Sequence, residues 1–522
     1  MNVSVNPPRK PILKLPATIA ATMRTHSNGQ RGTGIESRWR EDPLLIVSNR
    51  GPVEHYRDRS GEIHLRRAGG GLATALAGVA KARPVTWLAS PVTAADRDVL
   101  ASGGGPEFDE GPQLHLVDSP RDTYDLFYGT FCNPLLWFLQ HSLWETLLRD
   151  DPAAEALYAW ERGYVPVNEA FAMAVVRELR SSSRPQQVML QDYQLYLVPS
   201  MIRRRASDAV LQHFVHIPWP TAETWRALPQ TITAAICGGL LANDSVTFQT
   251  ERCARHFVAT CQDALLGVRQ TADGVLYGGR RTRVWANPIS VDVKDLRQRV
   301  ASARARTYAE KLAPKRGEKT ILRVDRLDPS KDVTGGFRSF ARLLEGHPEW
   351  HGRVRFLACL VPSRSKIPEY KEYTEDALAL AEGINVRHGT KAWTPVTIYL
   401  EENRTQALAA MQAYDVLLVN SIADGMNLVS KEGPIVNDRD GVLVLSKTAG
   451  SYAELRRGAL VVEPGDVDGT AEALHAALTM PPDERSRRAQ TLRAAIERHD
   501  LDDWLQLQIE DVERGRVAAQ SA

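Results

Sequence analysis

The stretch "YDVLLVNSIADGMNLVSKEG" (414–433) joins an apolar run of strand length to a polar loop and then to a helical pattern. A short run that is apolar throughout is typical of a strand buried on both faces of a parallel sheet. Within nine residues, the loop and the helix start carry Asp424, Gly425, Asn427, Lys431 and Glu432. A strand-to-helix turn needs only a glycine and a cap, so this surplus of polar groups predicts a ligand site at the end of the strand.

The same alternation of strand and helix patterns runs through most of the chain. Before residue 294 the β-rich runs include "PLLIVSN", "VTWLAS", "QQVMLQDY" and "DSVTFQT". After the charged stretch "VKDLRQRVASARARTYAEKLAPKRGEK" (293–319), a second series begins with "KTILRVDR" and ends with "GALVVEP". Strands separated by helices predict a mainly parallel sheet covered on both faces. The repetition therefore predicts an α/β chain with two Rossmann-like, doubly wound domains facing a cleft.

We predict domain boundaries from changes in composition. Residues 1–41 are rich in Pro, Ser, Thr, Asn and basic residues, and we expect a disordered tail. The N-terminal domain is expected to span residues 42–294 and the C-terminal domain residues 295–482. A helical stretch over 483–515 contains Trp504 and Leu505 and should pack back on the domains. The apolar segment "LPATIAATM" is short for a secretory signal, which favours a cytoplasmic location over export.

The composition of the chain argues against nucleic acids and membranes as binding partners. The 522 residues are 43% hydrophobic and 25% charged, and the formal charge is only +2. Basic and acidic residues are interspersed, which argues against nucleic acid or a membrane surface as a partner. The apolar runs are also much shorter than the roughly 20 residues of a membrane-spanning helix. The five cysteines have no metal-ligand spacing and their number is odd, so buried, reduced thiols in a cytoplasmic protein are expected.

The first candidate site is formed by "SNRGP" (48–52) and "RRAGGGLATALAG" (66–78). Consecutive glycines, including Gly70 and Gly71, before a helical pattern let backbone N–H groups approach an anion. Arg50, at the end of the first strand, could clamp a phosphate with two hydrogen bonds. The alternative is a tight turn without a ligand.

The second candidate site is "RVDRLDPSKD" (323–332), where a strand ends in Arg326, Asp328 and Lys331. An arginine fork and a lysine five residues apart can hold two phosphoryl groups. The alternative is a solvated loop in which Asp328 caps the next helix.

The third candidate site is the stretch quoted first. A helix that begins near Asn427 would point the backbone N–H groups of Gly425, Met426, Asn427 and Leu428 at a diphosphate. Asp424 would then accept a hydrogen bond from a sugar hydroxyl, and Glu432 from a ribose diol. The alternative is a capped helix with an exposed Lys/Glu face.

Two further strands end in ionisable residues, in "LQDYQLYLVP" and "HFVHIPWPTAETW". Asp192 and His216 are therefore expected at the same, carboxyl edge of a parallel sheet, where ligands bind in such folds. Four aromatic residues could stack on sugar rings, although burial in the core is the alternative for each: Tyr128, Trp137, Trp219 and Trp393.

In this order, the motifs resemble those of the trehalose-6-phosphate synthase family of retaining glycosyltransferases. The resemblance covers roughly residues 43–511 and rests on "VSNRGP", "GGGLATAL", "NPLLWFLQH", "QDYQLYLVP", "HIPWP", "NPISVD", "VDRLDPSK", "PSR", "WTP", "DGMNLVSKE" and "GVLVLSKTAG". It implies a GT-B fold and the transfer of glucose from a nucleotide sugar to glucose 6-phosphate. It also implies retention at the donor carbon, no metal or cofactor, and a possible dimer or tetramer.

The resemblance also implies roles for individual residues. Catalytic roles fall to Asp192, His216, Arg326 and Lys331, with His216 over the reacting sugars. The donor diphosphate, sugar and ribose would be bound by Arg326, Lys331, Asp424, the backbone from Gly425 to Leu428, and Glu432. The acceptor and its 6-phosphate would be bound by Arg50, Gly70, Gly71, Tyr128, Trp137, Asp192 and Arg364.

Several positions depart from the family pattern. The usual "LDYSKG" is "LDPSKD" here, so Pro329 and Asp332 alter the loop, and we expect the Asp332 side chain to point outward. Ala423 replaces an arginine that commonly precedes "DGMNL", and "KEGPIVN" replaces "KEYVA". These changes leave the donor base open. They also leave three alternatives: a glucosylglycerol-phosphate synthase, a pseudo-glycosyltransferase that couples cyclitols, and an inactive homologue that senses sugar phosphates.

Overall fold

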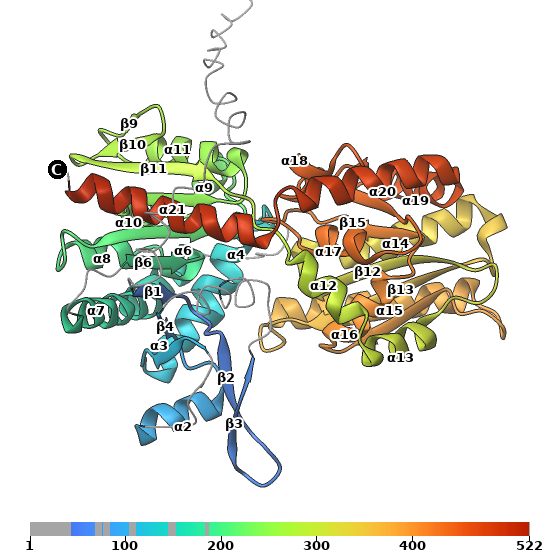
Figure 1. The fold of residues 1–522 in the computed structure, drawn as a ribbon, viewed down its shortest axis with the longest axis horizontal. Helices are drawn as coiled ribbons and strands as arrows, with labels where there is room; N and C mark the ends of the chain where they lie inside the picture. The colour runs from blue at the N-terminus through green and yellow to red at the C-terminus, as the bar shows by residue number, and fades with distance from the viewer. Residues whose placement is uncertain are drawn as a thin grey trace, which may run out of the picture. The chain divides into compact units, whose positions relative to one another are not determined.

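The computed structural model describes residues 43–67, 76, 84–103, 111–144, 153–182 and 187–520 (Figure 1). The predicted tail, residues 1–41, and the glycines Gly70 and Gly71 lie outside the described residues. One compact unit comprises Asp42–Ala522.

Nine strands of the described residues form the first sheet, and its core is parallel as predicted. Their order across the sheet is β5 (Gln113–Leu116), β4 (Val85–Ala89), β1 (Leu44–Val47), β6 (Gln187–Gln191), β7 (Val210–Val215), β8 (Ser245–Phe248), β11 (Arg280–Ala286), β10 (Gly274–Tyr277) and β9 (Arg269–Gln270). The last two strands, β10 and β9, run antiparallel to their neighbours. A separate hairpin pairs β2 (Val53–Arg57) with β3 (Ile63–Arg67).

The second sheet is wholly parallel in the part of the chain that the structure describes. Its order is β14 (Val396–Leu400), β13 (Val354–Pro362), β12 (Lys319–Leu327), β15 (Val416–Val419), β16 (Val442–Ser446) and β17 (Leu460–Val462). Strands β12 and β15, which precede two of the candidate sites, are direct neighbours. The loops that follow them therefore leave the sheet side by side.

Helices cover both faces of each sheet, as the all-apolar strands predict. The first half of the chain contains α2 (Ala94–Ser102), α3 (Arg121–Asp125), η2 (Leu126–Leu136), α4 (Trp137–Gln140), α6 (Ala153–Ala159), η3 (Trp160–Tyr164), α7 (Val165–Ser181), η4 (Tyr193–Leu195), α8 (Val198–Arg203), α9 (Ala222–Trp225), α10 (Gln230–Leu240) and α11 (Glu251–Ala264). The second half contains α12 (Val293–Val300), α13 (Ala303–Leu312), η5 (Pro329–Lys331), α14 (Val333–Gly346), η6 (Pro348–Trp350), α15 (Pro368–His388), α16 (Arg404–Met411), α17 (Val429–Val436), α18 (Tyr452–Leu455), α19 (Val467–Thr479), α20 (Pro482–Glu497) and α21 (Leu501–Gln520).

Strand β15 illustrates why both faces are apolar. Val416 and Leu418 pack in one core with residues of α14, α15 and α19. Leu417 and Val419 pack in another core with residues of α12, α16, α17 and α20. Alternate side chains of a strand point to opposite faces, so a strand between two helical layers is apolar on both faces.

The terminal helical stretch is divided between the two sheets. Helix α20 packs against α17 and β16 of the second sheet. Helix α21 instead lies on β7 of the first sheet, where the ring of Trp504 meets that of Phe214 at 5.5 Å. Gln212 also donates a hydrogen bond to Asp511 at 2.8 Å. The chain therefore returns at its end to the sheet that it built first (Figure 1).

All five cysteines are free and buried, which confirms the prediction of unpaired thiols. Within the described ranges, none of the helices has the length and apolar character needed to cross a membrane.

Candidate active site

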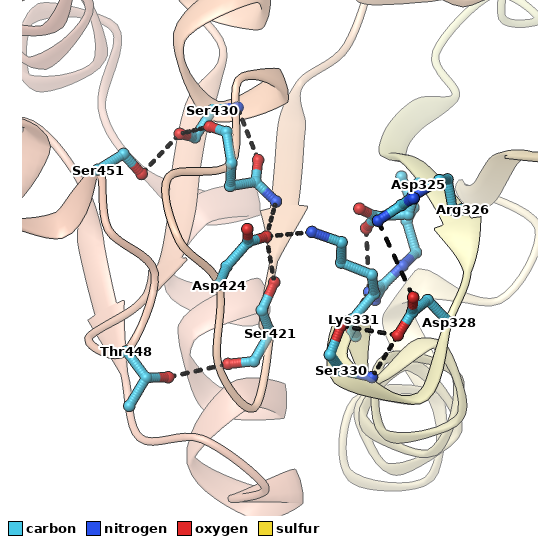
Figure 2. Close-up of polar contacts among 12 residues, drawn as sticks. Asp325, Arg326, Asp328, Ser330, Lys331, Ser421, Asp424, Ser430, Thr448 and Ser451 are labelled. Carbon is cyan, nitrogen blue, oxygen red and sulfur yellow. Dashed lines mark hydrogen bonds and ion pairs between the residues drawn. The ribbon is translucent and has the colours of Figure 1, made fainter. Parts of the chain in front are cut away.

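The two polar loops of the second sheet meet at the carboxyl ends of β12 and β15. The Lys331 ammonium forms an ion pair with the Asp424 carboxylate (Figure 2). The Ile422 N–H also donates to the Ser330 carbonyl at 2.9 Å. Two of the three candidate sites found in the sequence therefore form one site.

Asp424 is held by several donors at once. Besides Lys331, the Asn427 amide donates to its carboxylate at 3.0 Å and the Ser421 hydroxyl at 3.4 Å. Burial opposes ionisation of Asp424, but Lys331 and Asn427 outweigh it and hold the pKa below its ordinary value. Asp424 is therefore an anion at neutral pH and can accept a hydrogen bond from a hydroxyl group.

The helix predicted to begin near Asn427 is present, and its first residue lies two positions further along the chain. Helix α17 begins at Val429, and Asn427 has a left-handed backbone with φ of 71°. The Asn427 side chain accepts from the Ser430 N–H at 3.1 Å while its amide binds Asp424. Asparagine tolerates this backbone region better than most residues. The backbone from Gly425 to Leu428 is thus a loop before the helix, not its first turn.

Gly425 brings this loop against the first sheet. A Cβ atom at Gly425 would lie 1.8 Å from the His216 carbonyl oxygen, at the end of β7. Only glycine fits such a close approach of two backbones. The loop that carries Asp424 and Gly425 therefore touches the strand end that carries His216.

Lys431 and Glu432 have partners that the sequence did not predict. Lys431 is buried and binds the Ile289 carbonyl at 2.9 Å and the Glu454 carboxylate at 2.7 Å, so it has a structural role. Glu432 forms an ion pair of 2.8 Å with Arg404. The Arg404 side chain is 50% exposed, so this pair faces solvent on one side.

Asp332 does not point outward, contrary to the prediction. Its carboxylate accepts from the Gly335 N–H at 3.0 Å and caps α14, and it also accepts from the Asn420 amide at 3.0 Å. Burial raises the pKa of Asp332, while Arg323 opposes that shift. The Asp332 carboxylate is thus engaged by groups of the protein, and neither of these partners is Lys331.

Asp328 joins the second sheet to the first. Its carboxylate accepts from Arg364 at 2.7 Å, from the Trp137 indole at 3.2 Å and from the Ser330 N–H at 3.0 Å. Burial opposes its ionisation, but the Arg364 and Arg326 guanidinium groups hold its pKa well below the usual range. Asp328 therefore caps the short turn η5, as one interpretation predicted, and anchors Arg364 as well.

Arg364 lies between the two sheets. Its guanidinium stacks over the Trp137 ring at 3.9 Å and donates to the Tyr370 hydroxyl at 2.7 Å. It also reaches the Tyr193 hydroxyl at 3.5 Å. Only 8% of the side chain is exposed. The Arg326 guanidinium lies 3.9 Å from the same Asp328 carboxylate oxygen, and 46% of its side chain is exposed.

Asp192 is partly buried at the end of β6 and has a strained backbone conformation. Its φ of 70° and ψ of 179° fall in a region that is almost confined to glycine. Its carboxylate accepts from the His216 N–H at 3.2 Å. Burial raises the pKa of Asp192 to about 7, despite hydrogen bonds from backbone N–H groups.

His216 is held on both ring nitrogens. Its Nε2 lies 2.9 Å from the Gln191 side-chain oxygen, and its Nδ1 lies 3.2 Å from the Gln249 amide nitrogen. This network fits a neutral ring that donates from Nε2 and accepts at Nδ1. Burial lowers the pKa of His216 to about 3, and His213 lowers it further. His216 is therefore neutral at physiological pH.

The remaining candidates fall into two groups. Tyr128 is half-buried and stacks with Tyr124 at 5.9 Å, and Arg50 is exposed beside Gly51 and Ser90. Trp219 and Trp393, in contrast, are core residues, as the alternative interpretation expected. Trp219 stacks on Trp225 at 4.5 Å, and the Trp393 indole donates to the Val354 carbonyl at 2.8 Å.

Strained backbone conformations gather in these loops. Six non-glycine residues of the described chain have a positive φ, and four of them are Asp192, Asp332, Arg364 and Asn427. Such conformations persist only where surrounding contacts enforce them, and they cluster at functional sites. Their positions support one site made from strand ends of both sheets.

Sequence reasoning missed several residues that support this site. The residues that were not singled out are Gln191, Gln249, Arg323, Asn420 and Arg404. The available signal was their position, because all except Arg404 lie in or directly after a buried strand, where a polar side chain needs a partner. In the described ranges, the two side-chain groups that could hold a metal ion lie elsewhere, at His347, Glu349 and His475 and at Asp58, Glu62 and His64.

Two parallel Rossmann-like sheets with polar loops at their carboxyl edges define a nucleotide-sugar transferase fold of the GT-B class. A family model described as Glycosyltransferase family 20 matches residues 42–514, and the chain belongs to this family. The chain is therefore a glycosyltransferase.

Similar proteins span nearly the whole chain. A trehalose-6-phosphate synthase of Mycolicibacterium vanbaalenii is 33% identical over 90% of this chain and 96% of its own length. A UDP-forming alpha,alpha-trehalose-phosphate synthase of Schizosaccharomyces pombe is 32% identical over 90% of each chain. A solved UDP-forming synthase from Burkholderia xenovorans, in complex with glucose-6-phosphate, has a TM-score of 0.77 and 28% identity over 90% of this chain and all of its own. The E. coli protein bound with UDP-2-fluoro glucose has the same TM-score and identity, over 90% of this chain and 99% of its own.

Proposed function

We propose that the chain makes trehalose 6-phosphate by transferring glucose, with retention, from UDP-glucose or another NDP-glucose to glucose 6-phosphate. The observation that carries this proposal is the Lys331–Asp424 pair, which lies in loops that also touch the His216 strand end through Gly425. A cation for a diphosphate and an anion for a sugar hydroxyl thus lie together. The names and bound ligands of the similar proteins support this choice of substrates.

Each side chain receives a role from its surroundings. Lys331 and the exposed Arg326 are placed to bind the donor diphosphate, and Asp424 to accept from the donor sugar. Glu432, beside Arg404, would bind the ribose. On the acceptor side, Arg364 and Arg50 would bind the 6-phosphate, and Tyr128, Trp137 and Asp192 would line the sugar. Gly70 and Gly71 stay a prediction from the sequence.

The reaction needs no covalent protein nucleophile in this proposal. Lys331 and Arg326 stabilise the negative charge that grows on the leaving diphosphate. That diphosphate can accept the proton of the attacking hydroxyl on the same face of the sugar. His216 is neutral and held at both ring nitrogens, so we assign it to orienting the sugars and not to proton transfer. The protein then acts mainly by placing the two sugars.

We also propose that no metal or cofactor is required, since Lys331 and Arg326 supply the positive charge. Activity that persists in excess EDTA would support this proposal, and activity lost with EDTA and restored by Mg²⁺ would contradict it.

The unpaired thiols support a reducing, cytoplasmic location. We also propose that the chain forms a homo-oligomer, either a dimer or a tetramer. The molar mass measured by light scattering during size-exclusion chromatography would test this proposal.

The predicted domain division is kept as a proposal, with boundaries at 42–294, 295–482 and 483–515. Because α12 begins at Val293 and α20 at Pro482, limited proteolysis should cut in the connections that precede these helices before it cuts within the sheets. Early cuts within the sheet strands would contradict it.

The decisive experiment is a matrix of nucleoside-diphosphate release. UDP-, GDP- and ADP-glucose are each combined with glucose 6-phosphate, with glycerol 3-phosphate and with no acceptor. Release that requires glucose 6-phosphate supports the proposal and identifies the base. Release that requires glycerol 3-phosphate would favour the glucosylglycerol-phosphate alternative. No release from folded protein would favour the cyclitol-coupling or sugar-phosphate-sensing alternative.

A further inference from the structure

We propose that Arg323 is a positioning residue that fixes Lys331 and Asp424 for donor binding, an inference that rests on the proposed function. Arg323 lies within β12, and its side chain is 0% exposed. A fully buried guanidinium is costly unless several partners satisfy it. One of its partners, Asp325, lies in the same strand, and the other two belong to the loops that carry the donor-binding pair.

The Arg323 guanidinium binds three groups. One terminal nitrogen donates to the Asn420 side-chain oxygen at 2.5 Å. The other donates to the backbone carbonyl of Lys331 and lies 3.1 Å from the Asp325 carboxylate. Arg323 therefore holds the backbone of Lys331 directly and the first residue after β15 through a side chain.

Asn420 closes the network on the other side. Its amide nitrogen donates to the Asp332 carbonyl at 3.1 Å and to the Asp332 carboxylate at 3.0 Å. That carboxylate in turn caps α14 through the Gly335 N–H. Lys331 is thus fixed by Arg323 at its own carbonyl and by Asn420 at the residue that follows it.

The start of α14 is shaped to admit this network. A Cβ atom at Gly336 would lie 2.5 Å from the Arg323 guanidinium and 3.3 Å from the Asn420 oxygen. A Cβ atom at Gly335 would lie 2.2 Å from the Asp332 carboxylate. Two consecutive glycines, unfavourable inside a helix, are therefore required by the polar side chains beside them.

The network explains how Asp332 is tolerated in a donor loop. Asp332 has a φ of 54°, a conformation more easily adopted by glycine. The cap and the Asn420 contact stabilise that conformation and engage the carboxylate within the protein. Arg323 contacts Asn420, Lys331 and Asp325. Arg364, the acceptor residue that follows β13 of the same sheet, is held instead by Asp328, Tyr370 and Tyr193. Loss of Arg323 should therefore affect donor binding much more than acceptor binding.

The test compares Arg323→Met with Arg355→Met as a matched control. Arg355, on the neighbouring strand β13, is also largely buried and binds the Leu312 carbonyl and the Thr320 hydroxyl. Both substitutions should lower the melting temperature. Only Arg323→Met should raise the KM for UDP-glucose and the Kd for UDP, by about 10-fold or more, with the KM for glucose 6-phosphate within about 3-fold.

A second variant guards against loss of folding. Asn420→Ala keeps Arg323 and its charge but removes the link to Asp332, and the same donor-selective effect is expected. If Arg323→Met does not fold, the donor-selective rise in the KM for UDP-glucose and the Kd for UDP is measured in Asn420→Ala instead.

Equal effects on both substrates, or a change in melting temperature alone, would overturn the inference. If the wild-type enzyme binds UDP but does not release it from UDP-glucose, the proposed function fails. The ratio of UDP affinities between wild type and variants would still decide the role of Arg323.

Discussion

Lys331 and Asp424 form an ion pair across the loops that follow the neighbouring parallel strands β12 and β15. Neither residue is close to the other in sequence, and the pairing of their strands brings them together. Removing either group leaves the charge of the other buried and without an ion-pair partner, which lowers the free energy of unfolding. This relationship gives the first prediction.

Lys331→Met should reduce turnover by about 100-fold or more, because the leaving diphosphate loses a cation that stabilises it. It should also lower the free energy of unfolding, because Asp424 loses its ion-pair partner. Lys447→Met is the control, since Lys447 forms an exposed pair with Glu463 and should change neither quantity. Steady-state kinetics and urea unfolding measure both effects. Wild-type turnover in Lys331→Met would remove Lys331 from the site.

Arg364→Ala should raise the KM for glucose 6-phosphate by about 10-fold or more, because a charge-assisted hydrogen bond to phosphate is worth about 1.5–3 kcal/mol. The KM for the donor should change far less. Arg226→Ala removes an arginine from an exposed pair with Asp263 and should leave both constants unchanged. Equal increases for donor and acceptor would mean that Arg364 acts through Asp328 and does not contact the acceptor phosphate.

Asp192→Gly should abolish most activity without lowering stability. The substitution relieves a backbone conformation that costs about 1–3 kcal/mol in a non-glycine residue and removes a partly buried carboxyl group. Asp192→Ala removes the same carboxyl group but keeps the strain, so it should be less stable than Asp192→Gly. Urea unfolding of the pair isolates the backbone contribution. An alanine variant at least as stable as the glycine variant would contradict the assignment of strain.

Stability should fall as the pH drops from about 6.5 towards 4. Burial lowers the pKa of His141 and of His213 to about 4 in the folded chain, from an ordinary value of 6.5. Protons then bind preferentially to the unfolded chain, so the stabilising contribution is complete above pH 6.5 and is lost below it. For His213 the loss is at most about 3 kcal/mol.

Unfolding experiments between pH 4 and 8 test this dependence, with His213→Gln as the comparison. The variant should lose less stability than the wild type over the acid range, because it has no imidazole to protonate. If the free energy of unfolding of the two proteins depends on pH in the same way, His213 is not the source of the acid destabilisation. Asp192 changes the free energy of unfolding in the opposite direction. Its pKa is raised to about 7, so its stabilising contribution is complete below pH 4 and is lost as the pH rises to 7.

The sequence predicted the two parallel sheets because their strands are mainly apolar and alternate with helices. It also predicted that polar residues after strands would meet, as Lys331 and Asp424 do. The hairpin at β10 and β11 was missed, although Gly278 and Gly279, both with positive φ, are a recognised hairpin signal.

Side-chain direction in the loops could not be predicted. Asn427 and Asp332 have left-handed backbones, and that local choice shortens α17 and turns the Asp332 carboxylate into the protein. Lys431 looked like part of the site but binds Ile289 and Glu454, because its position on α17 faces away from the loop. Such choices depend on contacts between distant segments, which a linear pattern does not contain.

The most direct test of the central claim is proton NMR of the product formed from UDP-glucose and glucose 6-phosphate. The account predicts a disaccharide phosphate in which the transferred glucose keeps the α configuration of the donor and is linked to the anomeric carbon of the acceptor. A product with a β-linked glucose, or UDP release without any disaccharide, would contradict it.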